Sequence, residues 1–422
     1  MTFSNVYMMN TILRKVFLAA IAVLILTGCR DDIFGTQNPR TQYNIYNWSQ
    51  LFDAYWKGMN NNYAFWDIDP TDWDAVYDEY KPQFDALSSA GFSDSLTNVK
   101  AFGMFDEMTA NLIDGHYKCT IQLPGMSSYI ISPSWERIYS RPGYHESNAT
   151  WWQQLYALQK MYAEKRLFID PYYGNCPVND TITLESNRYI CGIIENDIVF
   201  LKFAQFTISA HLDTGDNVDS LFKYCYYHYL DSLPNIKGVI IDVRSNGGGY
   251  LNDLSLLLGK FVNEDHLVFY TRQKNGYDRL DYTPWIPEIL EPTERNRELN
   301  VPIVVLADMN SVSMAEMTAM SILSMPNGCV IGERTHGGIG QLSNSNAAFD
   351  DYYGGYFLIP GPYNNPLMEV YTTMTMTKDI NGNIYEGVGV PPTIEEPYDA
   401  QSLANGVDNQ LERAIEYIRT RK

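Results

Sequence analysis

The sequence contains few cysteines, and they are widely spaced. Six cysteines occur among 422 residues, and no two of them form the C-x-x-C pattern of zinc sites and thiol redox centres. The zinc-peptidase pattern H-E-x-x-H and the phosphate-binding pattern G-x-x-x-x-G-K-[S/T] are also missing. The sequence therefore offers no motif evidence for zinc, redox or nucleotide chemistry, and we predict no metal and no organic cofactor.

Positive charge is scarce as well. The chain has 30 Lys and Arg residues against 50 Asp and Glu residues, which gives a formal net charge of −20. Such a chain is repelled by nucleic-acid phosphates and by anionic lipid headgroups, so we expect no nucleic-acid partner. Its hydrophobic content of 45% is sufficient for one large domain with a smaller helical one.

The sequence has no apolar run long enough to cross a membrane comfortably. The apolar stretch 16–26 follows a basic Arg-Lys pair and ends in L-T-G-C, which resembles a bacterial lipobox. We therefore predict a cleaved lipoprotein signal peptide over residues 1–29, with Cys29 as the lipidated first residue, and a tether over residues 30–44. The lipid would hold the protein on a membrane of the cell envelope. We expect an outer-membrane lipoprotein facing the periplasm or the cell surface.

Export to an oxidising compartment permits disulfides. Five cysteines follow Cys29, so they cannot all pair. Cys176 and Cys191 are the closest of them in sequence, and we predict a disulfide between these two.

A glycine-rich turn after a buried strand is the first indication of catalysis. Residues 239–243 are apolar and β-branched, which predicts a core strand. The strand is followed by Arg-Ser-Asn and three glycines, and then by a helical pattern over residues 251–262. Glycines permit positive φ angles and close approach of a ligand to main-chain N–H groups. Such a turn can bind either a phosphate or a developing oxyanion, and the turn alone does not distinguish the two.

A second strand–turn–helix unit spans residues 301–325 and places Ser313 where the helix begins. A serine at such a junction stands clear of the sheet beside the positive end of the helix dipole. Its hydroxyl could be a nucleophile, with N–H groups of Met314, Gly247 and Gly248 as oxyanion donors. The S-x-x-E pattern formed with Glu316 is also a capping box, in which both side chains only satisfy helix N–H groups.

The two turns together resemble the catalytic domain of the carboxyl-terminal processing and tricorn-core serine peptidases. The shared motifs are I-D-V-R-S-N-G-G-G and S-V-S-M-A-E, with G-E-R-T-H-G-G at 332–338 and E-G-V-G-V-P-P at 386–392 as the next turn and the closing strand. Residues 46–80 resemble the helical segment that precedes this domain, and L-I-D-G-H at 112–116 resembles its D-G-H motif. The resemblance runs from about residue 46 to the end and is weakest between 122 and 188.

The resemblance also suggests how the serine is activated, since its hydroxyl needs a base. One branch of the family uses a Lys in the turn after the nucleophile, but that position is Gly338 here. The tricorn-like branch uses the His of the D-G-H motif, which is His116, and a carboxylate at the position of Glu386. A Ser precedes the His in that branch, whereas this chain has Gly115. His336 is the alternative base, and Glu386 could instead be a solvated turn residue.

The fold class implied by the resemblance is α/β, a crotonase- and ClpP-like catalytic domain with stacked β-sheets and flanking helices, preceded by a small helical domain. We expect the helical domain at 45–115, an insert or degenerate PDZ-like region at 116–190 and the catalytic domain at 191–422. The least legible part, 122–187, lacks a G-L-G-F-like carboxylate-binding loop.

The sequence thus predicts an exported, lipid-anchored serine endopeptidase of the Ser-His type, with peptides or protein tails as substrates. Cleavage would proceed through an acyl-enzyme. Two other functions stay open. One is a non-catalytic peptide-binding relative in which Ser313 only caps its helix. The other is a surface lipoprotein that binds or cleaves glycans, for which the 14% aromatic content is the only indication.

Overall fold

A computed structural model describes residues 45–176, 189–276, 278–294, 297–342, 355–361 and 366–421. The predicted signal peptide, Cys29 and the tether lie outside these residues. Residues 45–422 form one compact unit by themselves. In the part of the chain that the structure describes, no helix combines the length and the apolar character needed to span a membrane.

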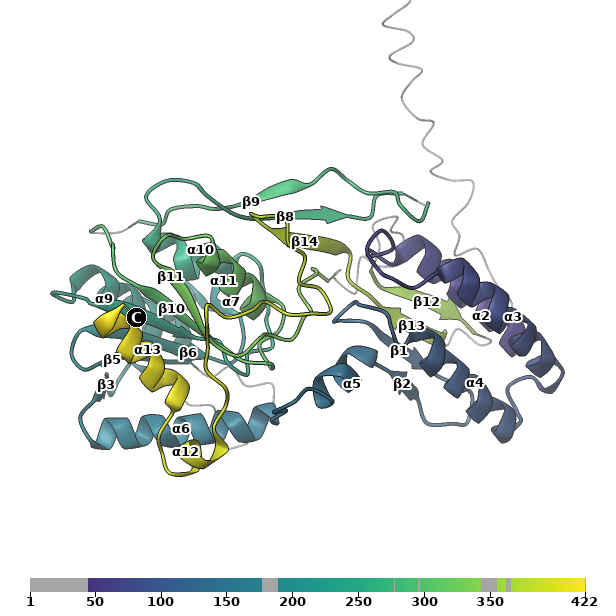
Figure 1. The fold of residues 1–422 in the computed structure, drawn as a ribbon, viewed down its shortest axis with the longest axis horizontal. Coiled ribbons are helices and arrows are strands. Elements are labelled where there is room, and N and C mark those ends of the chain that lie inside the picture. Colours follow the sequence, from purple (N-terminus) through teal and green to yellow (C-terminus); the bar gives the residue numbers. More distant parts are fainter. Residues whose placement is uncertain are drawn as a thin grey trace, which may run out of the picture. The chain divides into compact units, whose positions relative to one another are not determined.

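An eight-stranded sheet is the centre of this unit (Figure 1). Its main strand order is β15-β11-β10-β7-β6-β5-β3, and β4 also pairs with β5. The strands from β6 to β15 run parallel, whereas β5 is antiparallel to its neighbours. The strand bounds are β3 Leu167–Ile169, β4 Asn175–Cys176, β5 Tyr189–Ile194, β6 Ile198–Phe203, β7 Gly238–Asp242, β10 Ile303–Ala307, β11 Gly328–Gly332 and β15 Ile394–Glu395.

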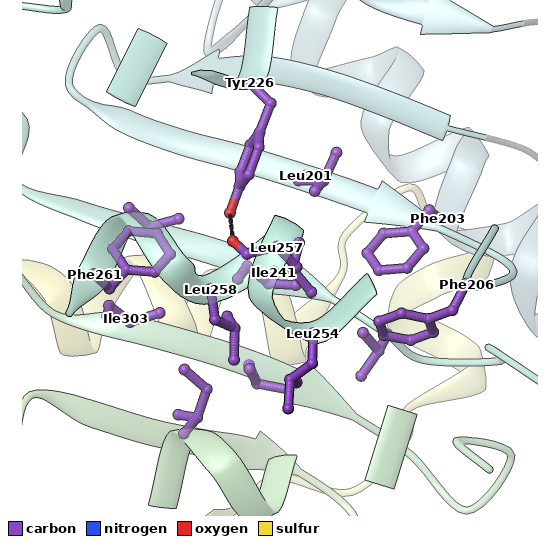
Figure 2. Packing of buried hydrophobic residues seen from close by; sticks show 14 of the residues in the cluster. Leu201, Phe203, Phe206, Tyr226, Ile241, Leu254, Leu257, Leu258, Phe261 and Ile303 are labelled. Atoms are coloured by element: carbon purple, nitrogen blue, oxygen red, sulfur yellow. Dashed lines mark hydrogen bonds between the residues drawn. The ribbon is translucent and has the colours of Figure 1, made fainter. Parts of the chain in front are cut away.

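Both faces of this sheet are buried, because its central strands are mostly apolar and every residue of β6, β7 and β10 is buried. In β7, Val239 and Ile241 belong to one hydrophobic cluster and Ile240 to the cluster on the opposite face. Figure 2 shows part of the first cluster, where the Tyr226 hydroxyl donates a hydrogen bond to the Leu257 carbonyl at 2.9 Å. The strand predicted over 239–243 is thus a core strand buried on both sides.

Helices cover the two faces of the sheet. One face packs against α8 Asn217–Leu221, the π-helical turn η2 Phe222–Tyr226, α9 Tyr227–Ser232, α10 Asp253–Leu258, η3 Gly259–Phe261 and α11 Met314–Leu323. The other face packs against α6 Ser147–Ala163 and α13 Asn409–Thr420. The short helices α7 Ile208–His211 and α12 Ala400–Ala404 complete this part. A parallel sheet whose two faces are both largely apolar is buried by helices packed on each face, as it is here.

The N-terminal helices form a second core with a small antiparallel sheet. This core contains α2 Trp48–Asn62, α3 Trp73–Leu87, η1 Ser88–Ala90 and α4 Ser95–Thr109. The sheet has the order β12-β13-β1-β2, with bounds Phe357–Pro360, Pro366–Tyr371, Lys118–Ile121 and Tyr129–Ile131. Strands from both ends of the chain therefore meet in one sheet. A third sheet consists of β14 Thr375–Asp379, β8 His266–Gln273 and β9 Ile286–Leu290, and α5 spans Pro133–Tyr139.

The predicted fold class is confirmed: the unit is α/β, with several sheets and flanking helices after a helical N-terminal region. Two local predictions are wrong. Residues 386–392 form a turn rather than a strand, because Gly387 and Gly389 have φ angles of 70° and 89°. The predicted disulfide is not formed, and Cys191 is a buried thiol. In the β4–β5 register Cys176 lies opposite Tyr189 rather than Cys191.

Candidate active site

The glycine turn that follows β7 is held in place by Asn246. The Asn246 side chain is buried, donates to the Phe203 carbonyl at 2.9 Å and accepts the Gly248 N–H at 2.8 Å. Its main-chain carbonyl accepts the Val312 N–H at 2.9 Å. One residue, through its side chain and its main-chain carbonyl, thus joins the end of β6, the glycine turn and the loop that carries Ser313.

Gly248 is the point of closest approach between the glycine turn and Ser313. Its φ angle is +87°, and a Cβ atom there would lie 2.6 Å from the Ser313 Cβ and 3.0 Å from the Met314 nitrogen. Only glycine fits such a position. The next residue, Gly249, has a φ angle of +147°, and a Cβ there would lie 1.9 Å from the Phe206 carbonyl oxygen.

The two glycines predicted as oxyanion donors have their N–H groups engaged within the protein. Gly247 donates to the Ala204 carbonyl at 3.2 Å, and Gly248 donates to Asn246 at 2.8 Å. The sequence pattern shows which residues form the turn but not where each peptide group points. The next glycine, Gly249, is therefore the better candidate for an oxyanion donor.

The N–H of Gly249 points toward the Ser313 side of the turn. The Gly248 carbonyl accepts the Phe206 N–H at 2.7 Å, and Phe206 follows β6, on one side of β7. In a trans peptide the carbonyl and the N–H point in opposite directions. The Gly249 N–H therefore points toward β10, after which Ser313 lies. Among the described residues, neither the Gly249 N–H nor the Met314 N–H donates to a protein acceptor.

Ser313 immediately precedes α11 with an unusual backbone conformation. Its φ and ψ angles are 58° and −116°. A serine that only caps a helix has β-region angles, whereas a left-handed conformation at a non-glycine residue is costly and is concentrated at functional sites. The predicted capping box with Glu316 is nevertheless present. Capping and catalysis are thus compatible at this residue, and capping alone does not explain its backbone.

Glu316 connects the loop that carries Ser313 with the turn at 335–338. Its buried carboxylate accepts the Thr335 hydroxyl at 2.5 Å and the N–H groups of Gly337 and Gly338 at 2.7 and 2.8 Å. It also accepts the Ser313 N–H at 3.2 Å. Burial raises the pKa of Glu316 to about 7. Its main structural role is therefore to hold a neighbouring turn, which the capping pattern did not indicate.

His116 is held by two buried carboxyl groups, those of Asp114 and Glu386. Asp114 accepts the His116 N–H at 2.8 Å, and Glu386 accepts the Gly115 N–H at 2.8 Å. Glu386 also accepts the N–H groups of Ile339 and Gly340, each at 2.9 Å. Glu386 is only 5% exposed, so it is not the solvated turn residue of the alternative interpretation.

One oxygen of Asp114, one oxygen of Glu386 and one ring nitrogen of His116 lie within 4.8 Å of one another. Burial raises the pKa of Asp114 to about 6. Burial, followed by the nearby charge of Asp114, raises the pKa of Glu386 well above its ordinary value. Two carboxyl groups this close disfavour each other's ionisation. The same three groups could surround a cation, but their carboxylate oxygens already accept main-chain N–H groups.

The His116 ring favours its neutral form. Burial lowers its pKa to about 4 because charging a desolvated imidazole is unfavourable. Its Nδ1 atom has no hydrogen-bond partner among the described residues. No hydrogen bond joins the ring to the Ser313 hydroxyl in this structure, but catalytic hydrogen bonds are often long before substrate binds.

Gly338 contacts both catalytic candidates. Its carbonyl accepts the Ser313 N–H at 2.9 Å, and a Cβ atom on Gly338 would lie 3.4 Å from the His116 Cε1. The serine loop and the imidazole therefore flank the same residue. A lysine at position 338, as in the Lys branch, would extend its side chain into the place that the His116 ring occupies.

His336, the alternative base, is a buried residue of the turn at 335–338. It is 3% exposed, and the edge of Trp135 contacts its ring at a centroid distance of 4.9 Å. Burial, with the nearby His116 as the next cause, lowers the pKa of His336 to about 3. Its main chain is fixed at both ends, since its N–H donates to the Ser311 carbonyl and its carbonyl accepts from Arg141. His336 does not line the cleft as the structure describes it.

The missing serine before the histidine has a steric explanation. A Cβ atom on Gly115 would lie 2.3 Å from both the Gly337 carbonyl oxygen and the Gly338 Cα. The loop carrying His116 and the turn at 337–338 are thus in direct main-chain contact. No residue larger than glycine fits between them without displacing one of the two.

A buried network of ion pairs fixes the residues that immediately precede the glycine turn. Arg244 is 1% exposed and forms paired hydrogen bonds to Asp242 at 2.6–2.9 Å and to Asp408 at 2.7–2.8 Å. Lys202 adds a bond of 3.1 Å to Asp242. Asp408 is the N-cap of α13. The C-terminal helix is therefore bonded to the strand that carries the glycine turn.

Ser313, His116 and the glycine turn open into one cleft of about 1000 Å³. One wall comes from the segment predicted as an insert and includes Trp135, Glu146 and Trp151. The lining also contains Met314 and Met317, and no Lys or Arg occurs among the described lining residues. Three remote stretches of sequence thus converge on a mostly apolar cleft with a serine, an imidazole and main-chain donors.

Residues 197–395 match the model of peptidase family S41, and residues 46–93 match that of the tricorn protease C1 domain. The chain carries a peptidase family S41 domain and a tricorn C1 domain. The resemblance inferred from the motifs is thereby confirmed, and it supports a serine-type peptidase.

Individual relatives are distant. The carboxy-terminal processing protease CtpA of Bacillus subtilis (strain 168) is 26% identical over 158 residues, which are 37% of this chain and 29% of that protein. The tricorn protease of Thermoplasma volcanium is 27% identical over 193 residues, which are 46% of this chain and 16% of that protein. The S41 domain is thus shared, while the chain spans less than a third of the length of either relative.

Two solved structures share the fold over most of the chain. A candidate peptidase of Parabacteroides merdae ATCC 43184 is 22% identical, with a TM-score of 0.61, and the match covers 88% of this chain and 96% of that one. Mature CPAF in complex with lactacystin is 12% identical, with a TM-score of 0.53, and the match covers 88% and 97%. At these identities the likeness establishes the fold.

Proposed function

We propose that this chain is an exported, lipid-anchored serine endopeptidase that cleaves peptides or unfolded C-terminal regions of proteins through an acyl-enzyme. The observation that carries the proposal is the meeting of Ser313, with its left-handed backbone, and His116 at one cleft. The apolar lining and the S41 domain support a polypeptide substrate.

In the proposed reaction Ser313 attacks a peptide carbonyl and His116 accepts the hydroxyl proton. His116 then donates this proton to the leaving amine, and water hydrolyses the acyl-enzyme by the reverse transfers. A Ser-His assignment is favoured over a Ser-Lys dyad because residue 338 is glycine and abuts the His116 ring. Glu386 and Asp114 hold the main chain that carries the ring, and negative charge on these carboxyl groups stabilises the imidazolium that forms.

The oxyanion is assigned to the N–H groups of Met314 and Gly249. Met314 is the first residue of α11, so its N–H also benefits from the helix dipole. Gly249 is preferred to Gly247 and Gly248 because the latter two donate to acceptors within the protein. Each preorganised donor of this kind typically contributes a factor of about 10²–10³ to the rate.

A fluorophosphonate probe tests the assignment. The wild-type chain should be labelled covalently at Ser313, and Ser313→Ala should not be labelled. Equal labelling of both would remove Ser313 from the mechanism. His116→Ala and His336→Ala then identify the base: we expect loss of labelling in the first and retention in the second, and the opposite pattern would make His336 the base.

A non-catalytic peptide-binding relative is the second candidate function. The formed capping box and the missing Ser313–His116 hydrogen bond favour it. In that case peptides bind in the cleft, no probe is attached and no peptide is cleaved. Peptide binding that is identical in wild type and Ser313→Ala, with no turnover by either, would establish this alternative.

The lipid anchor is proposed from the sequence of residues 1–29. We expect incorporation of a radiolabelled fatty acid into the wild-type chain and none into Cys29→Ala. Fractionation of the cell envelope would then show whether the protein resides in the outer membrane. Labelling that is unaffected by Cys29→Ala would refute the anchor without affecting the proposed peptidase.

A further inference from the structure

The loop that carries His116 has no regular secondary structure, yet four consecutive N–H groups in it donate to side chains. Ile113 donates to Asp69 at 2.9 Å and Asp114 donates to the Tyr63 hydroxyl at 3.2 Å. The next two donate to the carboxyl groups already described, Gly115 to Glu386 and His116 to Asp114. Side-chain hydrogen bonds, rather than a helix or strand, therefore hold the main chain that carries the imidazole.

Two of these acceptors come from the N-terminal helical region, about fifty residues before the histidine. Tyr63 is the C-cap of α2 and is completely buried, and Asp69 is 9% exposed. The Tyr63 hydroxyl donates to the Asp69 carboxylate at 2.6 Å, and the other carboxylate oxygen accepts the Thr71 N–H at 2.9 Å. The Tyr63 ring packs against Trp66 at a centroid distance of 4.6 Å. Both acceptors are thus fixed by their own surroundings.

We propose that Tyr63 and Asp69 are positioning residues for His116, and that the N-terminal helical region is in this way a working part of the peptidase. This inference rests on the proposed function. Neither side chain lines the described cleft, so they act through the main chain of residues 113 and 114. Burial and the nearby Asp69 and Asp114 raise the pKa of Tyr63 well above its ordinary value, which keeps its hydroxyl protonated as the donor to Asp69.

The expected effect is large for residues so far from the reacting atoms. A displacement of about 1 Å in a catalytic group costs roughly a hundredfold in rate, and supporting side chains must hold such a group to about 0.5 Å. Tyr63→Phe removes both hydrogen bonds of the hydroxyl while keeping the packed ring. It leaves the Asp114 N–H, in a buried loop, without its acceptor.

Tyr226→Phe is the matched control. Tyr226 is also fully buried and its hydroxyl also makes a main-chain hydrogen bond, to the Leu257 carbonyl (Figure 2). It lies in a different hydrophobic core, on the face of the main sheet to which Val239 and Ile241 of β7 contribute. Both variants lose a buried tyrosine hydroxyl, but only one loses contact with the His116 loop.

Two measurements on the purified full chain test the proposal. Hydrogen exchange of the segment 112–117 should become about tenfold faster in Tyr63→Phe, as expected for one lost hydrogen bond, and stay unchanged in Tyr226→Phe. The fluorophosphonate acylation rate should fall about ten- to a hundredfold in Tyr63→Phe, with the apparent affinity for a peptide substrate unchanged. Asp69→Asn, which keeps the shape but removes an acceptor, should give an intermediate loss.

The outcomes separate the two proposals. Exchange and acylation in Tyr63→Phe that equal those of Tyr226→Phe would overturn the positioning role. If the wild-type chain is not acylated at all, the proposed peptidase fails, and the exchange measurement still decides whether Tyr63 holds the loop. If Tyr63→Phe does not fold, Asp69→Asn carries the same comparison.

Discussion

Adding one methyl group at Gly248 is expected to inactivate the protein while the methyl at its neighbour Gly247 is tolerated. A Cβ atom on Gly248 would lie 2.6 Å from the Ser313 Cβ, 2.9 Å from the Val312 carbonyl oxygen and 3.0 Å from the Met314 nitrogen. The methyl can fit only if the serine loop or the glycine turn moves. At Gly247 an added Cβ meets nothing within 4 Å.

The magnitude follows from two separate costs. An L-residue with a φ angle of +87° loses about 1–2 kcal/mol of stability from backbone strain. The contact with Ser313 adds a displacement of the order of 1 Å, which corresponds to a roughly hundredfold loss of acylation rate. Gly247 has no positive φ angle, so Gly247→Ala should change the rate no more than about threefold.

The assay is the rate of fluorophosphonate labelling of Gly248→Ala and Gly247→Ala, each corrected for the folded fraction from urea unfolding. Gly248→Ala should be slow even where it is fully folded. Equal rates in the two variants would refute the close approach of Gly248 to the nucleophile. A large loss in Gly247→Ala alone would restore the donor role first predicted for that residue.

Three further predictions follow from the site. Burial lowers the pKa of His116 to about 4, so the ring stays neutral in mildly acidic solution. The acylation rate should therefore fall only as the pH drops through about 4. A pH–rate profile that falls near the ordinary histidine pKa of 6.5 would contradict this. Arg244→Met leaves Asp242 and Asp408 buried without their guanidinium partner and should cost about 3–5 kcal/mol in urea unfolding; a loss no greater than that of Lys223→Ala, which breaks an exposed pair with Asp213, would show that the network contributes little. Gly115→Ser restores the tricorn-like residue but places a Cβ 2.3 Å from the Gly337 carbonyl oxygen, so its melting temperature and acylation rate should both decrease, and faster acylation would disprove the steric explanation.

Much of the catalytic domain could be predicted from local patterns. The apolar runs of β7 and β10 are short, β-branched and followed by glycine or a polar turn, so both strand–turn–helix units were correctly located. Ser313, His116 and Glu386 were suggested by the family motifs around them. The structure places one ring nitrogen of His116 and one oxygen of Glu386 within 4.8 Å of each other, with Glu386 buried and His116 partly exposed.

The orientation of single peptide groups could not be predicted in this way. Which of Gly247, Gly248 and Gly249 has an N–H available for an oxyanion depends on the hydrogen bonds between the turn and residues 204–206, which follow β6. These hydrogen bonds are set by strand pairing rather than by the glycine run. The resemblance of residues 386–392 to the closing strand of the family predicted a strand there, whereas the positive φ angles of Gly387 and Gly389 end any extended structure at that point.

Local patterns were enough to indicate the family, the two strand–turn–helix units and the glycine in place of a lysine at position 338. These depend on residue identity and on spacings of a few residues, which are present before the chain folds. Other features became visible only in the folded chain: Tyr63 and Asp69 hold the His116 loop, Gly115 has no space for a side chain, and Glu316 holds the turn beside Ser313. Each of these is a contact between segments remote in sequence, and the hydrogen-bond partners of a buried group depend on what folding brings next to it.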